Sequence, residues 1–227
     1  MIVMDQLEKI IEVNNESMQK YNHTLDSEMK EILTYARTNH IPVLLEDTAK
    51  LLFSTVYNQK PSTVLEIGTA IGYSGTLLLN ATNCILTTIE NFESNYLLAK
   101  KHFASATLTN RVEMIFDDAY NAIVNLNDNH RKFDFIFLDG PKGQYIKYLP
   151  ILKSMLNDGG ILFADNVHFK GMVFMEGTIP HRKRTIVVNL RKYLAQIKND
   201  PDFETIELDV GDGVTISRLK NKLKRKY

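Results

Sequence analysis

The stretch 63-TVLEIGTAIGYSGTLLLN-80 decides the fold of this chain. Its first residues, TVLEI, are mostly apolar and indicate a short buried strand. Gly68 and Gly72 then allow the backbone to turn tightly and let a ligand approach closely. The residues from Gly72 onward favour a helix, so the stretch predicts a strand that turns directly into a helix.

The same alternation of strand and helix continues along the chain. We expect further strands at residues 84–90, 112–116, 133–139 and 159–166. We expect helices at residues 92–106, 119–127, 143–156 (kinked at Pro150) and 185–200. This pattern predicts an α/β fold with a doubly wound, mostly parallel sheet covered by helices on both faces. A C-terminal hairpin of residues 203–210 and 213–219 should add one antiparallel strand at the sheet edge or near it.

The N-terminal part differs, because its apolar residues recur at helical spacing. We expect a helical segment at residues 1–60, the main domain at residues 61–219 and a basic tail at residues 220–227. One helix is expected at residues 26–40, with Asp26 or Ser27 as its N-cap. Residues 1–40 either cover a ligand pocket or make a dimer contact, and the sequence leaves both readings open.

Composition limits the class of protein. The chain has 227 residues, of which 44% are hydrophobic, so it suits one globular domain or one domain with a small appendage. The single cysteine, Cys84, excludes an internal disulfide framework and favours a reducing cytoplasm. The start lacks the basic segment and apolar core of a secretory signal, and no run approaches the roughly 20 apolar residues that span a bilayer. We therefore expect a cytoplasmic protein with no membrane partner.

The net charge is zero, but the charges are unevenly spread. Residues 1–50 hold 5 Lys and Arg against 9 Asp and Glu, whereas residues 170–227 hold 13 against 7. Two basic clusters, HRKR at residues 181–184 and KNKLKRK at residues 220–226, make this C-terminal excess. A basic region on a neutral protein can attract polyanions. A solvated surface explains the tail better, whereas both readings stay open for HRKR.

Polar residues follow the expected parallel strands, at the point where each strand ends. They are Gly68, Glu90, Asp118, Asp139 and the pair Asp165-Asn166. In open α/β sheets, ligands bind beyond the carboxyl ends of the strands. The sequence therefore predicts a ligand site along this edge of the sheet.

The first three of these positions suit a nucleoside that carries a positive charge. The pattern E-x-G-x-x-x-G at residues 66–72 differs from G-x-G-x-x-G, and Glu66 favours a cationic ligand over a diphosphate. Glu90 follows Gly72 by 18 residues, where a carboxylate can accept hydrogen bonds from both hydroxyls of a ribose. Residues 117–119 could bind an adenine edge. S-adenosylmethionine is a ligand of this kind.

Five motifs carry a family resemblance: VLEIGTAIGYS, TTIE, DDA, LDGPKGQY and ADNV, in this order. Over residues 40–219 the chain resembles the class I S-adenosylmethionine-dependent methyltransferases. More narrowly, it resembles the cation-dependent O-methyltransferases typified by the catechol and caffeoyl-CoA enzymes. The resemblance implies a seven-stranded sheet, a bound divalent cation and, often, a homodimer.

The resemblance also implies roles for individual residues. It assigns cofactor binding to Glu66, Gly68, Gly72, Ser74, Glu90, Asp118, Ala119 and Asp139. It assigns the metal to Asp139, Asp165 and Asn166, and catalysis to Lys142. The chain departs from the catechol enzyme around the lysine, where Gly140-Pro141 and Gly143-Gln144 replace bulky and charged neighbours. This departure leaves the substrate pocket open.

The residue chemistry agrees with a metal site. Two carboxylates and an amide oxygen are hard ligands that suit Mg²⁺ or another divalent cation. Asp139 and Asp165 end consecutive expected strands, which lie about 5 Å apart if they are neighbours in the sheet. The alternative is an Asx turn at Asp165-Asn166 and a helix N-cap at Asp139. His168, two residues past Asn166, reads as a surface histidine, although it could line the mouth of the site.

Lys142 follows Asp139 by three residues, behind a Gly-Pro turn that aims it back at the metal. A hydroxyl bound to a divalent cation loses its proton easily, and a lysine beside the cation can accept that proton. An ordinary surface lysine is the alternative, but helix N-termini disfavour cations.

The acceptor should carry a hydroxyl beside a second oxygen, so that it can chelate the metal. The stretches IPVLLEDTAKLL, LDGPKG and HRKRT resemble bacterial members that methylate 5-hydroxyuridine at the tRNA wobble position, which gives 5-methoxyuridine. Arg182, Lys183 and Arg184 would then bind phosphates of the anticodon loop beside the site.

Three other functions remain open. The first is O-methylation of a small catechol or other phenol, which needs no basic cluster. The second is a nicotinamide-dependent dehydrogenase, for which the dinucleotide glycine pattern is missing. The third is an RNA-binding module without catalytic activity, in which Lys142 would have no chemical role.

Overall fold

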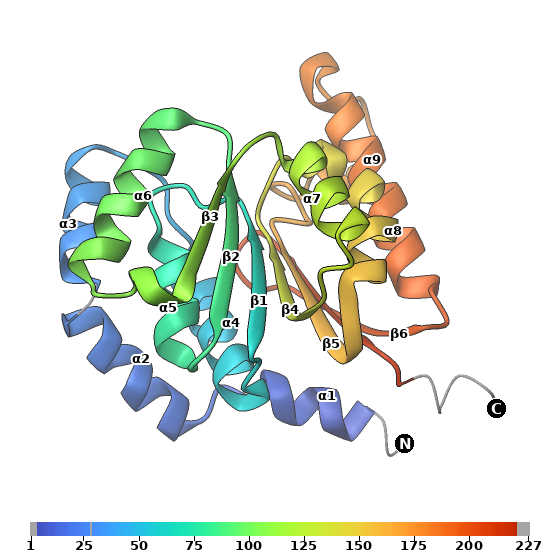
Figure 1. Cartoon of the computed structure of the whole chain (residues 1–227). Coiled ribbons are helices and arrows are strands. Elements are labelled where there is room, and N and C mark those ends of the chain that lie inside the picture. The colour runs from blue at the N-terminus through green and yellow to red at the C-terminus, as the bar shows by residue number, and fades with distance from the viewer. Residues whose placement is uncertain (1–3, 28, 222–227) are drawn as a thin grey trace. The chain divides into compact units, whose positions relative to one another are not determined.

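The structure is a computed structural model that describes residues 4–27 and 29–221. Its strands form a seven-stranded sheet in the order β3-β2-β1-β4-β5-β7-β6, in which only β7 is antiparallel to its neighbours (Figure 1). This confirms the α/β fold and the single antiparallel strand near the edge. The chain divides into two compact units, one ending at Ala119 and the other beginning at Tyr120. The predicted division at residues 60 and 219 stays a prediction.

The N-terminal unit holds three parallel strands and most of the helices that precede and connect them. The strands are β1 (Thr63–Ile67), β2 (Ile85–Glu90) and β3 (Val112–Phe116). The helices are α1 (Met4–Ile11), α2 (Asn15–Ser27), α3 (Lys30–Thr38), α4 (Glu46–Gln59), α5 (Tyr73–Ala81), α6 (Glu93–Ser105) and the short η1 (Thr109–Arg111). The apolar strands β1 and β2 are buried almost throughout, because helices connect parallel strands across the faces of a sheet.

The helix expected at residues 26–40 is shorter than predicted. Helix α2 continues through Ser27, and α3 begins only after Met29, so neither Asp26 nor Ser27 is its N-cap. Met29 is fully buried, and its backbone N–H bonds to the Thr24 carbonyl, which closes a turn between the two helices. Burial of this apolar side chain therefore sets the boundary that a polar cap was expected to set.

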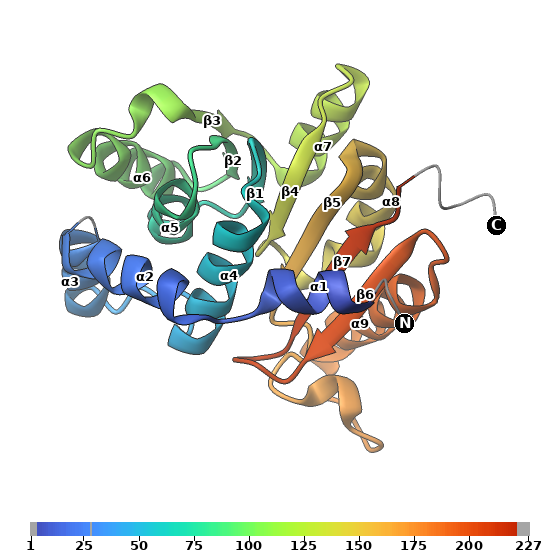
Figure 2. The same ribbon diagram turned by 90° about the horizontal axis from the view of Figure 1, so that it is seen from below.

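The C-terminal unit holds the other four strands, and α7 (Ala119–Asp128) begins at its boundary. The strands are β4 (Phe133–Leu138), β5 (Leu156–Asp165), β6 (Phe203–Leu208) and β7 (Val214–Leu219). The helices are η2 (Lys142–Gln144), α8 (Tyr145–Met155), η3 (Met172–Phe174) and α9 (His181–Asn199). Figure 2 shows β7 between β5 and β6, as the hydrogen-bond registers require.

Two helices of this unit begin at other residues than predicted. Helix α8 contains Pro150, as expected, but it begins at Tyr145, after the short η2. Helix α9 begins at His181, four residues before the expected start, so the HRKR cluster forms its first turn. The Lys183 N–H bonds to the Pro180 carbonyl at 2.8 Å, and this bond closes the turn. The sequence did not place these basic residues in the helix because they do not match its apolar period.

Two predictions from composition can be compared with the structure. Cys84 is buried as a free thiol, and burial raises its pKa to about 11. None of the described helices is long and apolar enough to cross a membrane.

Candidate active site

Backbone hydrogen bonds to β2 hold the glycine turn after β1. Gly68 and Gly72 have φ angles of 101° and 85°, a region that glycine adopts without strain. The N–H groups of Gly68 and Thr69 bond to the Ile89 carbonyl at 3.0 and 3.1 Å, which fixes the turn to the end of β2. A Cβ at Gly72 would lie 3.3 Å from the Phe103 ring, so the position is also sterically tight.

Glu66 and Ser74, both predicted to bind the cofactor, contact each other beneath this turn. Ser74 Oγ donates to Glu66 Oε1 at 2.5 Å, and Thr88 Oγ1 donates to Oε2 at 2.6 Å. Glu66 is 0% exposed. Its carboxylate therefore links β1, β2 and the first turn of α5, and its negative charge lies below the loop rather than on its surface.

Glu90 is fixed by backbone N–H groups on both sides. Its Oε2 accepts from Ala70 at 2.8 Å, and its Oε1 accepts from Asn91 and Phe92 at 2.9 and 2.8 Å. Each carboxylate oxygen accepts about two hydrogen bonds, so Oε2 keeps capacity for one ligand hydroxyl. The carboxylate is thus preorganised, but it offers less than the two free oxygens expected for a ribose.

Asp118 and Ala119 lie close to Glu90 along the strand ends. The N–H of Asp117 bonds to the Glu90 carbonyl at 3.1 Å, which brings the end of β3 next to the end of β2. Asp118 is exposed, and Ala119 is the first residue of α7. The predicted cofactor residues of the N-terminal unit therefore surround one edge of three strands, and their contact with a cofactor stays a prediction.

A second group of polar residues lies in the C-terminal unit, after β4 and β5. Leu138 pairs with Ala164 in the parallel ladder, so Asp139 and Asp165 follow directly on neighbouring strands. This confirms that the two strands are adjacent. Burial, followed by the charge of Asp139, raises the pKa of Asp165 to about 7. A buried carboxylate beside a second, partly exposed one favours a bound cation.

Lys142 and Asn166 complete the group, which we call the Asp139 cluster (Asp139, Lys142, Asp165 and Asn166). The Lys142 ammonium forms an ion pair with Asp139 Oδ1. Asn166 has a φ of 56°, and its backbone N–H donates to Asp165 Oδ1 at 2.7 Å. Within residues 4–27 and 29–221, the Asn166 amide side chain has no hydrogen-bond partner, so its oxygen is available to a ligand.

The donor set of the Asp139 cluster fits a hard divalent cation. In the described part of the chain, no group of three His, Cys, Asp or Glu side chains could hold a metal ion. The cluster contributes two carboxylates, and the third ligand would be the Asn166 amide oxygen, the oxygen chemistry that Mg²⁺ prefers. A cation would also offset the two effects that raise the pKa of Asp165, which are burial first and repulsion by Asp139 second.

Two supporting residues were missed in the sequence. The Tyr145 hydroxyl is fully buried, 3.0 Å from the Leu138 carbonyl and 3.1 Å from the Asp165 carbonyl, so it bridges the ends of β4 and β5. Asn189 Nδ2 donates to the Gly143 carbonyl at 2.7 Å, which ties α9 to the turn that carries Lys142. A buried tyrosine needs a hydrogen-bond partner, which was the available signal. Asn189 gave none.

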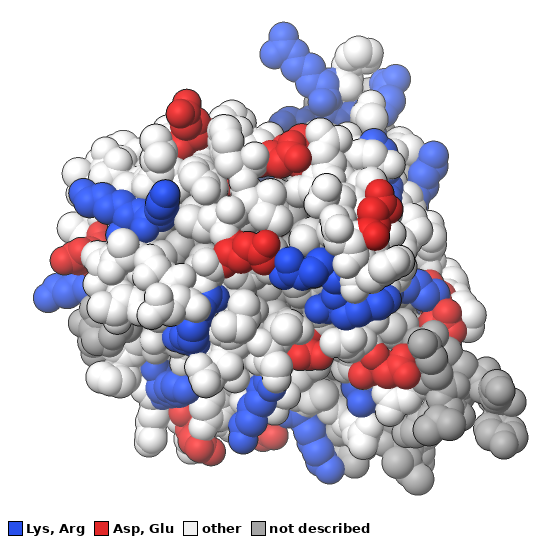
Figure 3. All heavy atoms as spheres, viewed as in Figure 1, with Lys and Arg blue, Asp and Glu red and all other residues white. Residues whose placement is uncertain are grey.

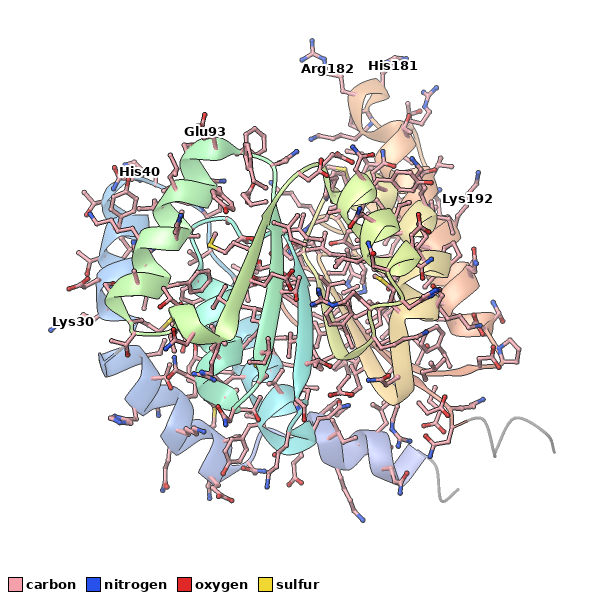
Figure 4. All side chains as sticks on the ribbon, viewed as in Figure 1. Lys30, His40, Glu93, His181, Arg182 and Lys192 are labelled. Carbon is pink, nitrogen blue, oxygen red and sulfur yellow. The ribbon has the colours of Figure 1, made fainter. Side chains whose placement is uncertain are left out.

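Arg182, Lys183 and Arg184 are exposed in the first turn of α9. Figure 4 shows Arg182 and His181 pointing outward from the projecting end of this helix, where Lys and Arg side chains also stand out in Figure 3. No acidic side chain in the described residues pairs with the three cations, and Lys183 Nζ lies 5.5 Å from the Phe169 ring centroid. Their predicted contact with nucleic acid stays a prediction.

Comparisons with known proteins agree on one family. A family profile described as O-methyltransferase matches residues 15–220. Tapetum-specific methyltransferase 1 from Arabidopsis thaliana is 26% identical over 203 residues, which cover 86% of this chain and 86% of that protein. Caffeoyl-CoA O-methyltransferase 1 from the same plant is 34% identical over 165 residues, which cover 68% of this chain and 62% of that protein.

Solved structures show the same fold. A candidate caffeoyl-CoA O-methyltransferase from Staphylococcus aureus has a TM-score of 0.78 and 27% identity, and the match covers 91% of this chain and 100% of that one. An O-methyltransferase from Bacillus cereus in complex with SAH has a TM-score of 0.77 and 23% identity, with coverage of 88% and 96%.

Proposed function

The chain belongs to the family of S-adenosylmethionine-dependent O-methyltransferases, and on this premise we propose that it methylates one hydroxyl of a small phenol. The phenol would carry a second oxygen next to the reacting hydroxyl, as a catechol does. Asp139, Asp165 and Asn166 would hold a divalent cation, and Lys142 would accept the hydroxyl proton.

The observation that carries this proposal is the Asp139 cluster itself. Burial, and then the neighbouring carboxylate of Asp139, raise the pKa of Asp165 to about 7, and Lys142 already forms an ion pair with Asp139. Relatives named for caffeoyl-CoA support a phenolic acceptor, because a caffeoyl ring carries two neighbouring hydroxyls. Together they favour the small phenol over the tRNA acceptor expected from the sequence.

The bound groups would supply an electrophilic methyl group from the sulfonium donor and a cation that makes the acceptor hydroxyl more acidic. The protein's own residues do the rest. Asp139 holds the Lys142 amine beside the cluster, where Nζ can take up the hydroxyl proton once it is itself deprotonated. Glu90 and the glycine turn would orient the donor, and Glu66 fixes that turn from below. Positioning of this kind accounts for much of the acceleration in such reactions.

The test is the substitution Lys142→Ala, assayed with a panel of catechols, S-adenosylmethionine and Mg²⁺. We expect kcat to fall by about 10²- to 10⁴-fold, the usual contribution of a positioned base, while the donor binds as before in calorimetry. Lys147→Ala is the matched control, because Lys147 is an exposed lysine of the following helix α8. Equal activity of the Lys142→Ala and wild-type proteins would overturn the assignment, and activity that survives a chelator would exclude the cation.

A second candidate function is methylation of 5-hydroxyuridine in tRNA, favoured by the basic first turn of α9. Three exposed cations at a helix N-terminus repel the helix dipole, and an anion such as a phosphate would offset that repulsion. The test is methylation of tRNA from a strain that lacks this protein, beside the catechol panel. Charge reversal by Arg182→Glu, Lys183→Glu and Arg184→Glu should abolish tRNA turnover and spare catechol turnover. No tRNA turnover by the wild type would exclude this candidate.

A further inference from the structure

His168 is not the surface histidine expected from the sequence. Only 7% of the residue is exposed, and its ring is hydrogen bonded to Glu207 of β6. Its Nε2 lies 2.9 Å from Glu207 Oε1, and its Nδ1 lies 3.6 Å from Asp209 Oδ1. The other oxygen of Glu207 accepts from Lys198 Nζ at 2.8 Å. His168 is therefore the buried end of a polar chain that reaches α9.

The backbone around His168 is fixed to the turn between β6 and β7. The N–H of Val167 bonds to the Gly213 carbonyl at 3.0 Å, and the N–H of His168 bonds to the Asp212 carbonyl at 3.0 Å. The N–H of Lys170 bonds to Asp212 Oδ1 at 2.6 Å. Three backbone N–H groups, those of Val167, His168 and Lys170, therefore hold the segment that directly follows the predicted metal ligand Asn166.

The ring of His168 has room only because residue 213 is glycine. A Cβ at Gly213 would lie 2.1 Å from His168 Cγ, and Gly213 also has a φ of +79°. On another side, the Phe174 ring packs edge-on with its centroid 4.8 Å from that of His168. The His168 ring and Gly213 therefore pack tightly against each other, and a substitution at either position should displace the other residue.

The His168 ring lies two residues from a position with positive φ. Asn166 has a φ of 56°, a left-handed conformation that asparagine adopts more readily than most residues but that still depends on how the surrounding backbone is held. Before Asn166 lies the regular strand β5, and after it lie the attachments of Val167 and His168. The His168 segment is thus the element that fixes the backbone on the C-terminal side of Asn166.

We propose that His168 is a positioning residue. It is hydrogen bonded to Glu207 and packed against Gly213, and it fixes the amide of Asn166 for metal binding. The inference rests on the cation site of the proposed function. His168 itself touches neither metal nor substrate. It acts on Asn166 through the backbone of Val167, the one residue between them. Loss of the His168 side chain should therefore weaken cation binding and leave donor binding unchanged.

The experiment measures Mn²⁺ affinity of the full chain by electron paramagnetic resonance, without donor or acceptor. We expect His168→Ala to raise the Kd for Mn²⁺ by about 10-fold or more, the usual effect of losing a group that orients a metal ligand. His168→Gln can still donate to Glu207, so it should restore most of the affinity. The affinity for S-adenosylmethionine, measured by calorimetry, should stay the same in both variants.

The control is His102→Ala, because His102 is equally buried at 7% exposed and its Nδ1 lies 2.7 Å from the Ile71 carbonyl in the other unit. It should lower thermal stability without changing the Kd for Mn²⁺. Glu207→Gln is the second variant if His168→Ala does not fold, and it should raise the Kd in the same direction.

The possible failures are distinguishable. A wild-type protein that does not bind Mn²⁺ overturns the proposed cation site, and this inference with it. A wild-type protein that binds Mn²⁺, with an unchanged Kd in His168→Ala or Glu207→Gln, overturns only the role of His168. An equal rise of the Kd in His102→Ala would also overturn it, because general destabilisation would then explain the effect.

Discussion

Single carboxylates of similar appearance serve different purposes in this protein. Glu66 is buried and accepts hydroxyl hydrogen bonds at both oxygens, so it stabilises a loop. Glu90 has backbone partners on both oxygens, with capacity left for a ligand. Asp165 is buried beside a second carboxylate, which raises its pKa to about 7. The environment of Asp165 costs stability, and a functional site can offset that cost by binding a cation.

The raised pKa of Asp165 predicts how stability depends on pH in metal-free protein. The ordinary value is 3.8 and the folded value about 7, so the folded state binds this proton more tightly than the unfolded state. The free energy of unfolding should therefore fall as pH rises through this window, by a few kcal/mol at most, since one unit is about 1.4 kcal/mol. Asp165→Asn should flatten this slope.

Urea unfolding between pH 4 and 8 in the presence of a chelator measures the effect. Asp128→Asn, which changes an exposed carboxylate of α7, should leave the slope as it is in the wild type. A wild-type slope of the opposite sign would show that Asp165 ionises readily in the fold without a cation.

At the scale of elements, the sequence located every strand but placed some helix ends wrongly. The apolar run FIFL is short and lies between two turns, so its length favoured a buried strand over a helix at β4. The start of α9 was missed because a closing turn of polar residues carries no apolar period. The break between α2 and α3 was missed because the burial of Met29 is a tertiary effect.

The glycine turn after β1 gives a prediction at this scale. Gly72→Ala places a side chain at a φ of +85°, 3.3 Å from the Phe103 ring, so we expect a loss of about 1–3 kcal/mol in stability. Affinity for S-adenosylmethionine should fall as well, because the turn carries the predicted donor residues. Chemical unfolding and calorimetry measure the two effects.

Gly177→Ala is the control for that substitution. Gly177 is exposed, and an added Cβ would meet nothing within 4 Å. Its stability and donor affinity should match those of the wild type. If Gly72→Ala matched the wild type too, the turn would not be the tight element described above.

At the scale of the whole molecule, motifs indicated the candidate site residues but not the contacts that support them. Asp139, Asp165 and Asn166 lie where strand ends predict them, because neighbouring parallel strands bring their carboxyl ends to one edge. The contact of His168 with Glu207 joins residues 39 positions apart, and the hydrophobic pattern of neither segment predicts it. Supports of this kind depend on the tertiary fold, and a single sequence does not show them.

The predicted homodimer and cytoplasmic location also concern the whole molecule and stay predictions. Light scattering on the purified full chain measures the first, and a mass of about twice the 26.0 kDa of one chain is expected. A mass of one chain, across the concentrations used for the activity assay, would contradict the dimer.

The left-handed backbone at Asn166 has a consequence for directed evolution of this site. Asparagine and aspartate tolerate that conformation and also carry a hard oxygen, whereas glycine tolerates it without offering any side-chain ligand. A saturation library at this codon should therefore pass a solubility screen with Gly, Asn and Asp enriched. A later selection for methyl transfer should remove Gly. The two screens at residue 166 would therefore separate the conformational requirement of the backbone from the requirement for a side-chain metal ligand.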